Sequence, residues 1–406
     1  MQSVRNLLKN TNLFRNGKHF LYSYSKMTPI APFILYSQFK QNYSHTNSST
    51  TQTHPLDNFY LDASLNKKQG KLDEALKQFE NLVVQIQKEK QLGMSFGLSE
   101  LYLNIGNIYS EKQDYEKAKE NWNKSIKQKT EEYGEDSLQL LEIYNPLADE
   151  AFESYKYEDA IYYAEQSLNI IKKHYKEDHP DIGKQYFTLG VLYFERHHFV
   201  KALENCQKAL EIYLKNPELH KEEVSFLYLK IAETYALQKD EKQAIENYQK
   251  GVQFTIDNFG EEYPKLADYY LFWSDIIRYN KEKLPESKSS LQKALNIYLK
   301  SEDVQSLTII DIHFDLGVML YLEANYEEAL KHFQESLQWT FDKGPLRPKV
   351  AEDTYNFVGL SYLQLKKFDE SIENFNKALE SCEKSGETKH LDVYHRNLGL
   401  AMKIKE

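Results

Sequence analysis

The apolar residues of this chain recur at helical spacing, three and four positions apart, with no sustained alternation. One pattern is repeated: an aromatic residue, a small residue three positions later, a bulky residue four further on and a second small residue after three more. It is seen in "QDYEKAKENWNKSI" (113–126), "HHFVKALENCQKAL" (197–210), "ANYEEALKHFQESL" (324–337) and "KKFDESIENFNKAL" (366–379). The pattern predicts amphipathic helices that share one packing scheme.

The first small residue of each copy returns at a nearly constant interval of 42 or 43 residues. These markers are Ala75, Ala118, Ala160, Ala202, Ala244, Ser287, Ala329 and Ser371. A fixed period in this range indicates a solenoid, in which each unit packs mainly against its neighbours.

A second small residue precedes most markers by twelve positions, so each unit holds two helices joined by a tight turn. The members of this second set are Gly106, Ala148, Gly190, Ala232, Gly317 and Gly359. Small side chains allow two helices to approach closely, and aromatic side chains fill the space beside them. The final segment, "LDVYHRNLGLAMKIKE", repeats a first helix and is expected to be a polar-faced cap.

The pattern small-x-x-Tyr followed by Tyr/Phe-x-x-Ala-x-x-x-Phe/Tyr-x-x-Ala resembles the tetratricopeptide repeat. The ordinary unit of that family has about 34 residues. The longer unit here resembles the kinesin-light-chain type, as do the phrases "KEDHPDIG" (176–183) and "GEEYPKLA" (260–267). The resemblance covers residues 57–406 and implies an all-α, right-handed superhelix of about eight helix pairs plus a C-terminal capping helix.

Composition agrees with a helical, globular body. Hydrophobic residues make up 41% of the chain and charged residues 28%, whereas the 15 Gly and 10 Pro are too few for a many-turned all-β fold. Cys206 and Cys382 are far apart and lie within the repeated pattern. We expect them to be small core residues in a reducing compartment, not a disulfide or a metal site.

Charge divides the chain into a basic N-terminal segment and an acidic body. Residues 1–56 carry six basic and no acidic side chains, so a segment of +6 precedes a body of −16, given the net charge of −10. The acidic body disfavours nucleic acid and anionic membranes as partners. The basic residues are Arg5, Lys9, Arg15, Lys18, Lys26 and Lys40.

Residues 1–56 are expected to be a mitochondrial transit peptide and a Ser/Thr-rich linker. On a helical wheel Val4, Leu7, Leu8 and Phe14 share one face, which is typical of such peptides. The linker is "SHTNSSTTQTH" (44–54). A disordered tail is the alternative. The apolar stretch "PIAPFILY" (29–36) is too short to span a bilayer, which needs about 20 residues, so no transmembrane segment is expected.

No pattern of catalytic or cofactor-binding residues is found in the sequence. HExxH, CxxC and GxSxG motifs and a glycine-rich phosphate loop are absent. His197 and His198 are adjacent in a predicted turn without further ligands, and His179-Pro180 is expected to shape a loop. We therefore expect no catalytic residue, no metal and no cofactor.

The resemblance places the ligand contacts of such a fold on the concave face, on the first helix of each unit. Transferring those positions predicts an aromatic and acidic groove, with further acids at Glu100, Glu142, Asp149 and Glu153. The alternative is that some of these residues only pack between units. The candidates are Lys184, Phe187, Val191, Phe194 and Glu195 in the unit marked by Ala202, Phe226, Leu229 and Glu233 in the unit marked by Ala244, and Asp311, Phe314 and Tyr321 in the unit marked by Ala329.

These observations predict a non-enzymatic protein–protein interaction scaffold. With the transit peptide, the expectation is a mitochondrial protein of the matrix or inner membrane surface. It would be an assembly factor or accessory subunit of a respiratory complex, and its partner a basic amphipathic segment or a subunit of that complex. The alternative is a cytosolic, kinesin-light-chain-like cargo adaptor. Residues 1–56 lack the heptads with which that family binds its motor.

Overall fold

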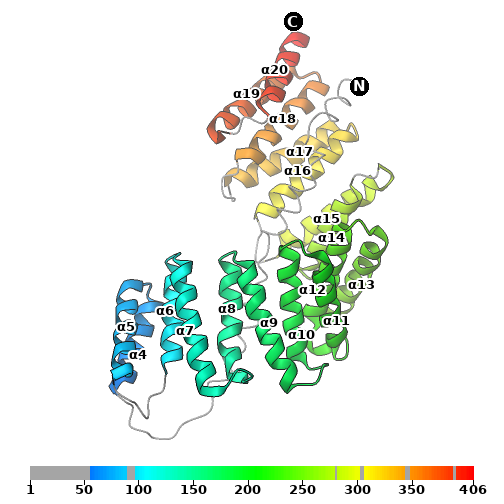
Figure 1. Ribbon diagram of the computed structural model, residues 1–406. Coiled ribbons are helices and arrows are strands. Elements are labelled where there is room, and N and C mark those ends of the chain that lie inside the picture. The colour runs from blue at the N-terminus through cyan, green and yellow to red at the C-terminus, as the bar shows by residue number, and fades with distance from the viewer. Residues whose placement is uncertain (1–54, 89–96, 279–280, 302–305, 343–347, 387–389) are drawn as a thin grey trace. The chain divides into compact units, whose positions relative to one another are not determined.

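The computed structural model describes residues 55–88, 97–278, 281–301, 306–342, 348–386 and 390–406. The predicted transit peptide and linker lie outside these residues, apart from their last two positions. Within the described residues all regular secondary structure is helical (Figure 1). The predicted all-α solenoid is confirmed, because within these residues first and second helices alternate in chain order from α4 to α19, and a final helix, α20, follows.

The described helices belong to two compact units, Met1–Gln238 and Lys239–Glu406. The predicted bounds, a segment 1–56 and a solenoid 57–406, stay a prediction. Unit 1 contains α4 (Pro55–Lys68), α5 (Leu72–Lys88), α6 (Leu98–Glu111), α7 (Tyr115–Tyr133), α8 (Leu141–Glu153), α9 (Tyr157–His174), α10 (Pro180–Glu195), α11 (Phe199–Tyr213) and α12 (Lys221–Leu237). Unit 2 contains α13 (Glu241–Phe259), α14 (Leu266–Ile277), α15 (Leu284–Lys300), α16 (Ser306–Leu322), α17 (Tyr326–Asp342), α18 (Pro348–Gln364), α19 (Phe368–Ser385) and α20 (Leu391–Lys405). The right-handed superhelical path of the whole chain stays a prediction.

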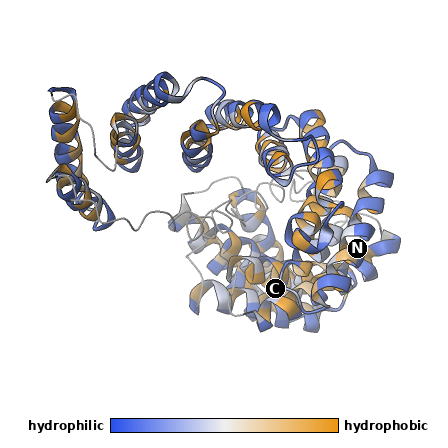
Figure 2. Ribbon diagram, turned by 90° about the horizontal axis from the view of Figure 1, so that it is seen from below, coloured by the Kyte–Doolittle hydropathy of each residue, from blue (hydrophilic) through white to orange (hydrophobic). Residues whose placement is uncertain are grey.

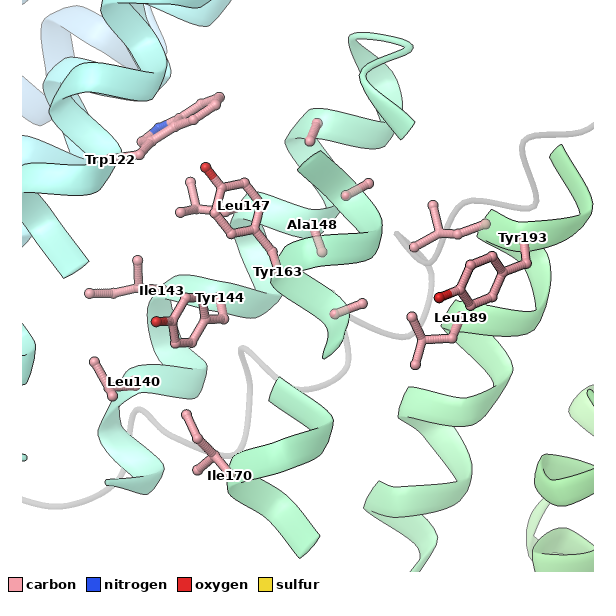
Figure 3. Packing of buried hydrophobic residues seen from close by; sticks show 14 of the residues in the cluster. Trp122, Leu140, Ile143, Tyr144, Leu147, Ala148, Tyr163, Ile170, Leu189 and Tyr193 are labelled. Carbon is pink, nitrogen blue, oxygen red and sulfur yellow. The ribbon is translucent and has the colours of Figure 1, made fainter. Parts of the chain in front are cut away.

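Each helix buries one stripe, so hydrophobic and hydrophilic segments alternate along the ribbons in Figure 2. In unit 1, α6 packs on α7, α8 on α9 and α10 on α11, and the next first helix then packs on the preceding second one. Side chains of successive repeats therefore form one core. Trp122 of α7, Leu147 of α8, Tyr163 of α9 and Leu189 of α10 belong to the same buried cluster (Figure 3).

The predicted small residues lie where the two helices of a pair cross. A Cβ on Gly106 would lie 2.3 Å from Cδ1 of Trp122, and one on Gly190 would lie 2.5 Å from Sγ of Cys206. Real Cβ atoms do not approach so closely, so only glycine allows these crossings. Cys206 is buried, as expected of a small core residue.

The turn between the two helices of a pair has the same backbone conformation in successive repeats. Gln113, Tyr155 and His197 in unit 1 have φ between 57° and 63°, and Ala324 and Lys366 in unit 2 have 63° and 60°. The turn is closed by the N–H of the next residue, which donates to a carbonyl five positions earlier, as in a Schellman motif. Such left-handed conformations cost a non-glycine residue about 1 kcal/mol.

The His-Pro phrase starts a helix. His179 is the N-cap of α10, its Nδ1 accepts a hydrogen bond from the N–H of Asp181 at 3.2 Å, and Pro180 is the first helical residue. The imidazole also stacks on Tyr175 with ring centroids 4.0 Å apart. These contacts give His179 the loop-shaping role predicted for it.

The last helix, α20, packs on the pair of α18 and α19 and makes polar contacts with α18. Tyr394 donates a hydrogen bond to Asp353 at 2.9 Å, and Asn397 donates one to Asn356 at 2.8 Å, all four side chains being buried. The outer surface of this cap is less polar than predicted, because three apolar side chains are about half exposed there. They are Leu400, Met402 and Ile404.

Candidate protein-interaction face

Several first helices contact the first helix of the next repeat directly. In unit 1, α6 contacts α8 and α10 contacts α12, and in unit 2, α16 contacts α18 and α18 contacts α20. Second helices such as α7 and α9 come less close. These first helices carry the ligand-contact positions transferred from the resembled family, and their placement on a concave face stays a prediction.

The candidates of two successive repeats come together on α10 and α12. Phe187 and Phe226 are in contact across the two helices, with ring centroids 5.2 Å apart and planes inclined by 42°. Both rings are half-buried, as are Val191 and Phe194. We call the surface formed by the exposed parts of these four residues, with Lys230, Glu195 and Glu233, the aromatic–acidic face.

Lys230 is the central residue of this face, and the sequence prediction missed it. Its Nζ lies 4.7 Å from the ring centroid of Phe194 and 5.4 Å from that of Phe226. The same atom donates to Oε2 of Glu233 at 2.7 Å. A signal was available, because Lys230 stands four positions after Phe226 and three before Glu233, so the three share one side of a helix.

The face carries more carboxylates than cations. Burial raises the pKa of Glu195, the nearby Lys230 lowers it and Glu233 raises it again. Glu233 is itself buried and bonded to Lys230. One ammonium group thus serves two carboxylates, which leaves this part of the surface with a surplus negative charge.

The predicted acids on α6 and α8 are neutralised by lysine residues of the protein to different degrees. Lys129 of α7 is buried and reaches Glu100 at 2.9 Å and Glu142 at 3.2 Å. Burial, with a smaller contribution from Glu153, raises the pKa of Asp149 to about 6 although Lys184 opposes the shift. Lys184 therefore acts on an acid of the preceding repeat, and Asp149 remains partly uncompensated.

Three candidates are buried in the protein. Leu229, Glu233 and Tyr321 are each less than 8% exposed. These three residues therefore pack inside the protein, as the alternative interpretation of the sequence predicted. The half-buried aromatic residues Phe187 and Phe194 offer more surface to a partner.

The candidates Asp311, Phe314 and Tyr321 lie on α16 in unit 2. Phe314 contacts Phe333 and Phe357 with ring centroids 6.0 and 5.7 Å away, and Tyr321 contacts Phe357 at 5.8 Å. Near them, Arg278 bridges two carboxylates at 3.3 and 3.4 Å, those of Asp275 and Asp315. Burial raises their pKa values to about 7 and about 6, and Asp311 adds to the first shift.

The described residues hold no group of three or more His, Cys, Asp or Glu side chains placed to bind a metal ion. A histidine pair between α16 and α17, with Nδ1 of His313 and His332 3.1 Å apart, is a hydrogen bond between the rings. No helix among the described residues is both long enough and apolar enough to cross a membrane.

Comparisons with known proteins agree with this geometry. Two family models, both described as tetratricopeptide repeat, match residues 97–173, 152–215 and 184–256 in one case and 352–385 in the other. A comparison of the sequence with curated proteins gives no match.

Solved structures with similar folds are themselves described as repeat proteins in several cases. A signal transduction ATPase with a tetratricopeptide repeat sensor, from Pyrococcus horikoshii, has a TM-score of 0.52 at 17% identity over 82% of this chain and 48% of its own. BtubC (BKLC) from P. vanneervenii has a TM-score of 0.46 at 16% identity over 60% of this chain and 92% of its own. Together with the helix pairing and the small-residue crossings, the matches show that this all-α chain contains tetratricopeptide repeats.

Proposed function

We propose that this protein is a non-enzymatic scaffold whose aromatic–acidic face binds a basic amphipathic segment of a partner protein. Tetratricopeptide repeats are protein-binding modules, and the repeat itself supplies only a surface. The observation that supports the proposal is the half-buried pair of Phe187 and Phe226 beside two carboxylates. Aromatic rings can bury the apolar side of an incoming helix, and the carboxylates attract its lysine or arginine residues.

The test compares partner binding by the parent and by Phe187→Ala/Phe226→Ala. Removing two central aromatic side chains should weaken binding by about 2 kcal/mol or more, or roughly thirtyfold. The matched control is Phe59→Ala/Phe341→Ala, which removes two phenylalanines that are about half exposed on α4 and α17. Circular dichroism must first show that both variants fold. If the control variant loses as much partner binding, or if Phe187→Ala/Phe226→Ala binds the partner like the parent, the aromatic–acidic face is not the binding site.

We further propose that the scaffold works in mitochondria, as an assembly factor or accessory subunit of an inner-membrane respiratory complex. The support is the basic, acid-free composition of residues 1–56 and the face shared by Val4, Leu7 and Leu8. The potential across the inner membrane would draw such a segment inward.

A reporter protein fused to residues 1–56 tests the proposed mitochondrial localisation. The intact fusion should enter mitochondria, and Arg5→Glu with Lys9→Glu should reduce entry. A uniformly cytosolic signal from the intact fusion would overturn the mitochondrial proposal and favour the cytosolic cargo adaptor. Copurification from isolated mitochondria, with Phe187→Ala/Phe226→Ala as the negative control, would then show whether the partner belongs to a respiratory complex.

A further inference from the structure

The ammonium group of Lys230 lies between two aromatic rings of the aromatic–acidic face. Its ammonium group lies over Phe194 and Phe226 at 4.7 and 5.4 Å from their centroids. Both distances are within the range in which a ring face attracts a cation. The surface therefore has a position that suits an ammonium or guanidinium group, and one side chain of the protein occupies it.

The charges around this position are unbalanced. Lys230 bonds to Glu233 at 2.7 Å, and the half-buried Glu195 on α10 lies close enough to both for each to act on its ionisation. The cluster of Lys230, Glu195 and Glu233 has a formal charge of −1 when all three are ionised. One additional cation would neutralise it in surroundings where water screens charge poorly.

We infer that Lys230 is an internal stand-in for the partner, occupying the position that a lysine or arginine of the bound segment takes beside Glu195. Apolar side chains one helical turn away on that segment would lie on Phe187 and Phe226. This inference rests on the proposed function, and it adds the chemistry of the contact: a basic residue flanked by apolar ones, admitted when Lys230 moves aside.

The opposite assignment, in which Lys230 captures an acidic partner, fits the structure less well. The Lys230 side chain is only 17% exposed, its ammonium group is bonded to a buried carboxylate, and two rings cover it. An acidic partner would have to compete with Glu233 for a group that is already desolvated. A basic partner meets the surplus carboxylate directly.

The experiment measures binding of two labelled synthetic helices to the full chain by fluorescence anisotropy. One helix is composed of leucine and lysine, and the other of leucine and glutamate. Lys230→Met keeps the length of the side chain and removes its charge, so it should bind the leucine–lysine helix about tenfold more tightly. Glu195→Gln should bind it about tenfold more weakly, because the pairing carboxylate is lost.

Lys208→Met is the matched control. Lys208 of α11 also bonds to a glutamate, Glu204, at 2.7 Å, and its Nζ lies 5.3 Å from the ring centroid of Tyr186. Its removal changes the net charge of the protein by the same amount on a second helix. An unchanged affinity in this control shows that the gain in Lys230→Met is local and not a long-range effect of charge.

Two results would overturn the inference: weaker binding of the leucine–lysine helix by Lys230→Met, or preference of the parent for the leucine–glutamate helix. Lys230→Met leaves Glu233 buried without this partner, so thermal unfolding is followed in parallel. If that variant does not fold, Glu195→Gln decides alone, because it retains the bond between Lys230 and Glu233.

The proposed function and this inference fail in different ways. If Phe187→Ala/Phe226→Ala loses the leucine–lysine helix while Lys230→Met and Glu195→Gln bind it like the parent, the face binds basic segments but Lys230 is no stand-in. If all three variants bind like the parent, the aromatic–acidic face is not the binding site and both proposals fall.

Discussion

The ring of Phe375 fills the place beside Gly359 where any other residue would carry its Cβ. That Cβ would lie 2.7 Å from Cε1 and 2.8 Å from Cδ1 of the ring, and Phe375 is fully buried. The crossing of α18 and α19 is thus set by one glycine and one aromatic ring that leave each other no further room.

Adding a single methyl group at this crossing should destabilise the protein. We expect Gly359→Ala to lower the free energy of unfolding by about 1–3 kcal/mol through overpacking, despite the better helix propensity of alanine. Urea denaturation measures the change. The double variant Gly359→Ala/Phe375→Leu should show positive coupling, since the smaller side chain makes room for the methyl group. Strict additivity of the two changes would contradict the assigned contact.

The left-handed turn residue of the second repeat offers a stabilising change. Gln113 has φ 63° and is exposed, so Gln113→Gly should relieve the backbone cost and raise the free energy of unfolding by about 0.5 kcal/mol. Gln113→Ala removes the same side chain without giving glycine's freedom, and it should bring no gain. Equal thermal midpoints for the two variants would refute the strain at this turn.

Asp149 should make stability depend on pH. Its pKa in the folded protein is raised to about 6 from a usual value of 3.8, so the folded state binds more protons between these pH values. The parent therefore loses stability as pH rises from about 4 to 6. At pH 8 Asp149→Asn should be the more stable by about 1–2 kcal/mol, and the advantage should vanish near pH 4. Urea titrations at both pH values measure it.

The control for that experiment is Asp62→Asn, at an exposed aspartate on α4. It should leave the stability of the parent nearly unchanged at both pH values. A similar gain at pH 8 in Asp62→Asn would mean that general charge repulsion in the acidic body, and not burial of Asp149, causes the effect.

The contact between Tyr394 and Asp353 should anchor the capping helix. Tyr394→Phe removes the hydroxyl that donates to the buried carboxylate at 2.9 Å, which leaves an acceptor desolvated and should cost about 1–3 kcal/mol. Hydrogen exchange of α20 should rise before that of α18. The double variant Tyr394→Phe/Asp353→Leu should recover part of the loss, and failure to recover any would show that the bond contributes little.

The sequence predicted the helix pairing because small residues such as Gly190 and Ala202 keep a fixed spacing that packing requires. It did not predict the position of Lys230, which is not among the ligand positions transferred from the resembled family. A lysine stem can extend along its helix and place its charge a turn away from its Cα. Nor does the spacing mark the division at residue 238, since the interval from Ala202 to Ala244 is regular.

The crossing of glycine and aromatic ring limits how the repeats can be exchanged. Gly317 faces Phe333 as Gly359 faces Phe375, so α17 and α19 should substitute for one another in a chimera. Helix α8 carries Ala148 at the corresponding place, and a transplanted α19 would bring Phe375 against its Cβ. Repeat units should therefore be exchangeable only where a glycine of the first helix faces an aromatic ring of the second. Exchanging a second helix between a unit with glycine and a unit with alanine at this place should give a poorly folded protein, even when the chain length is kept.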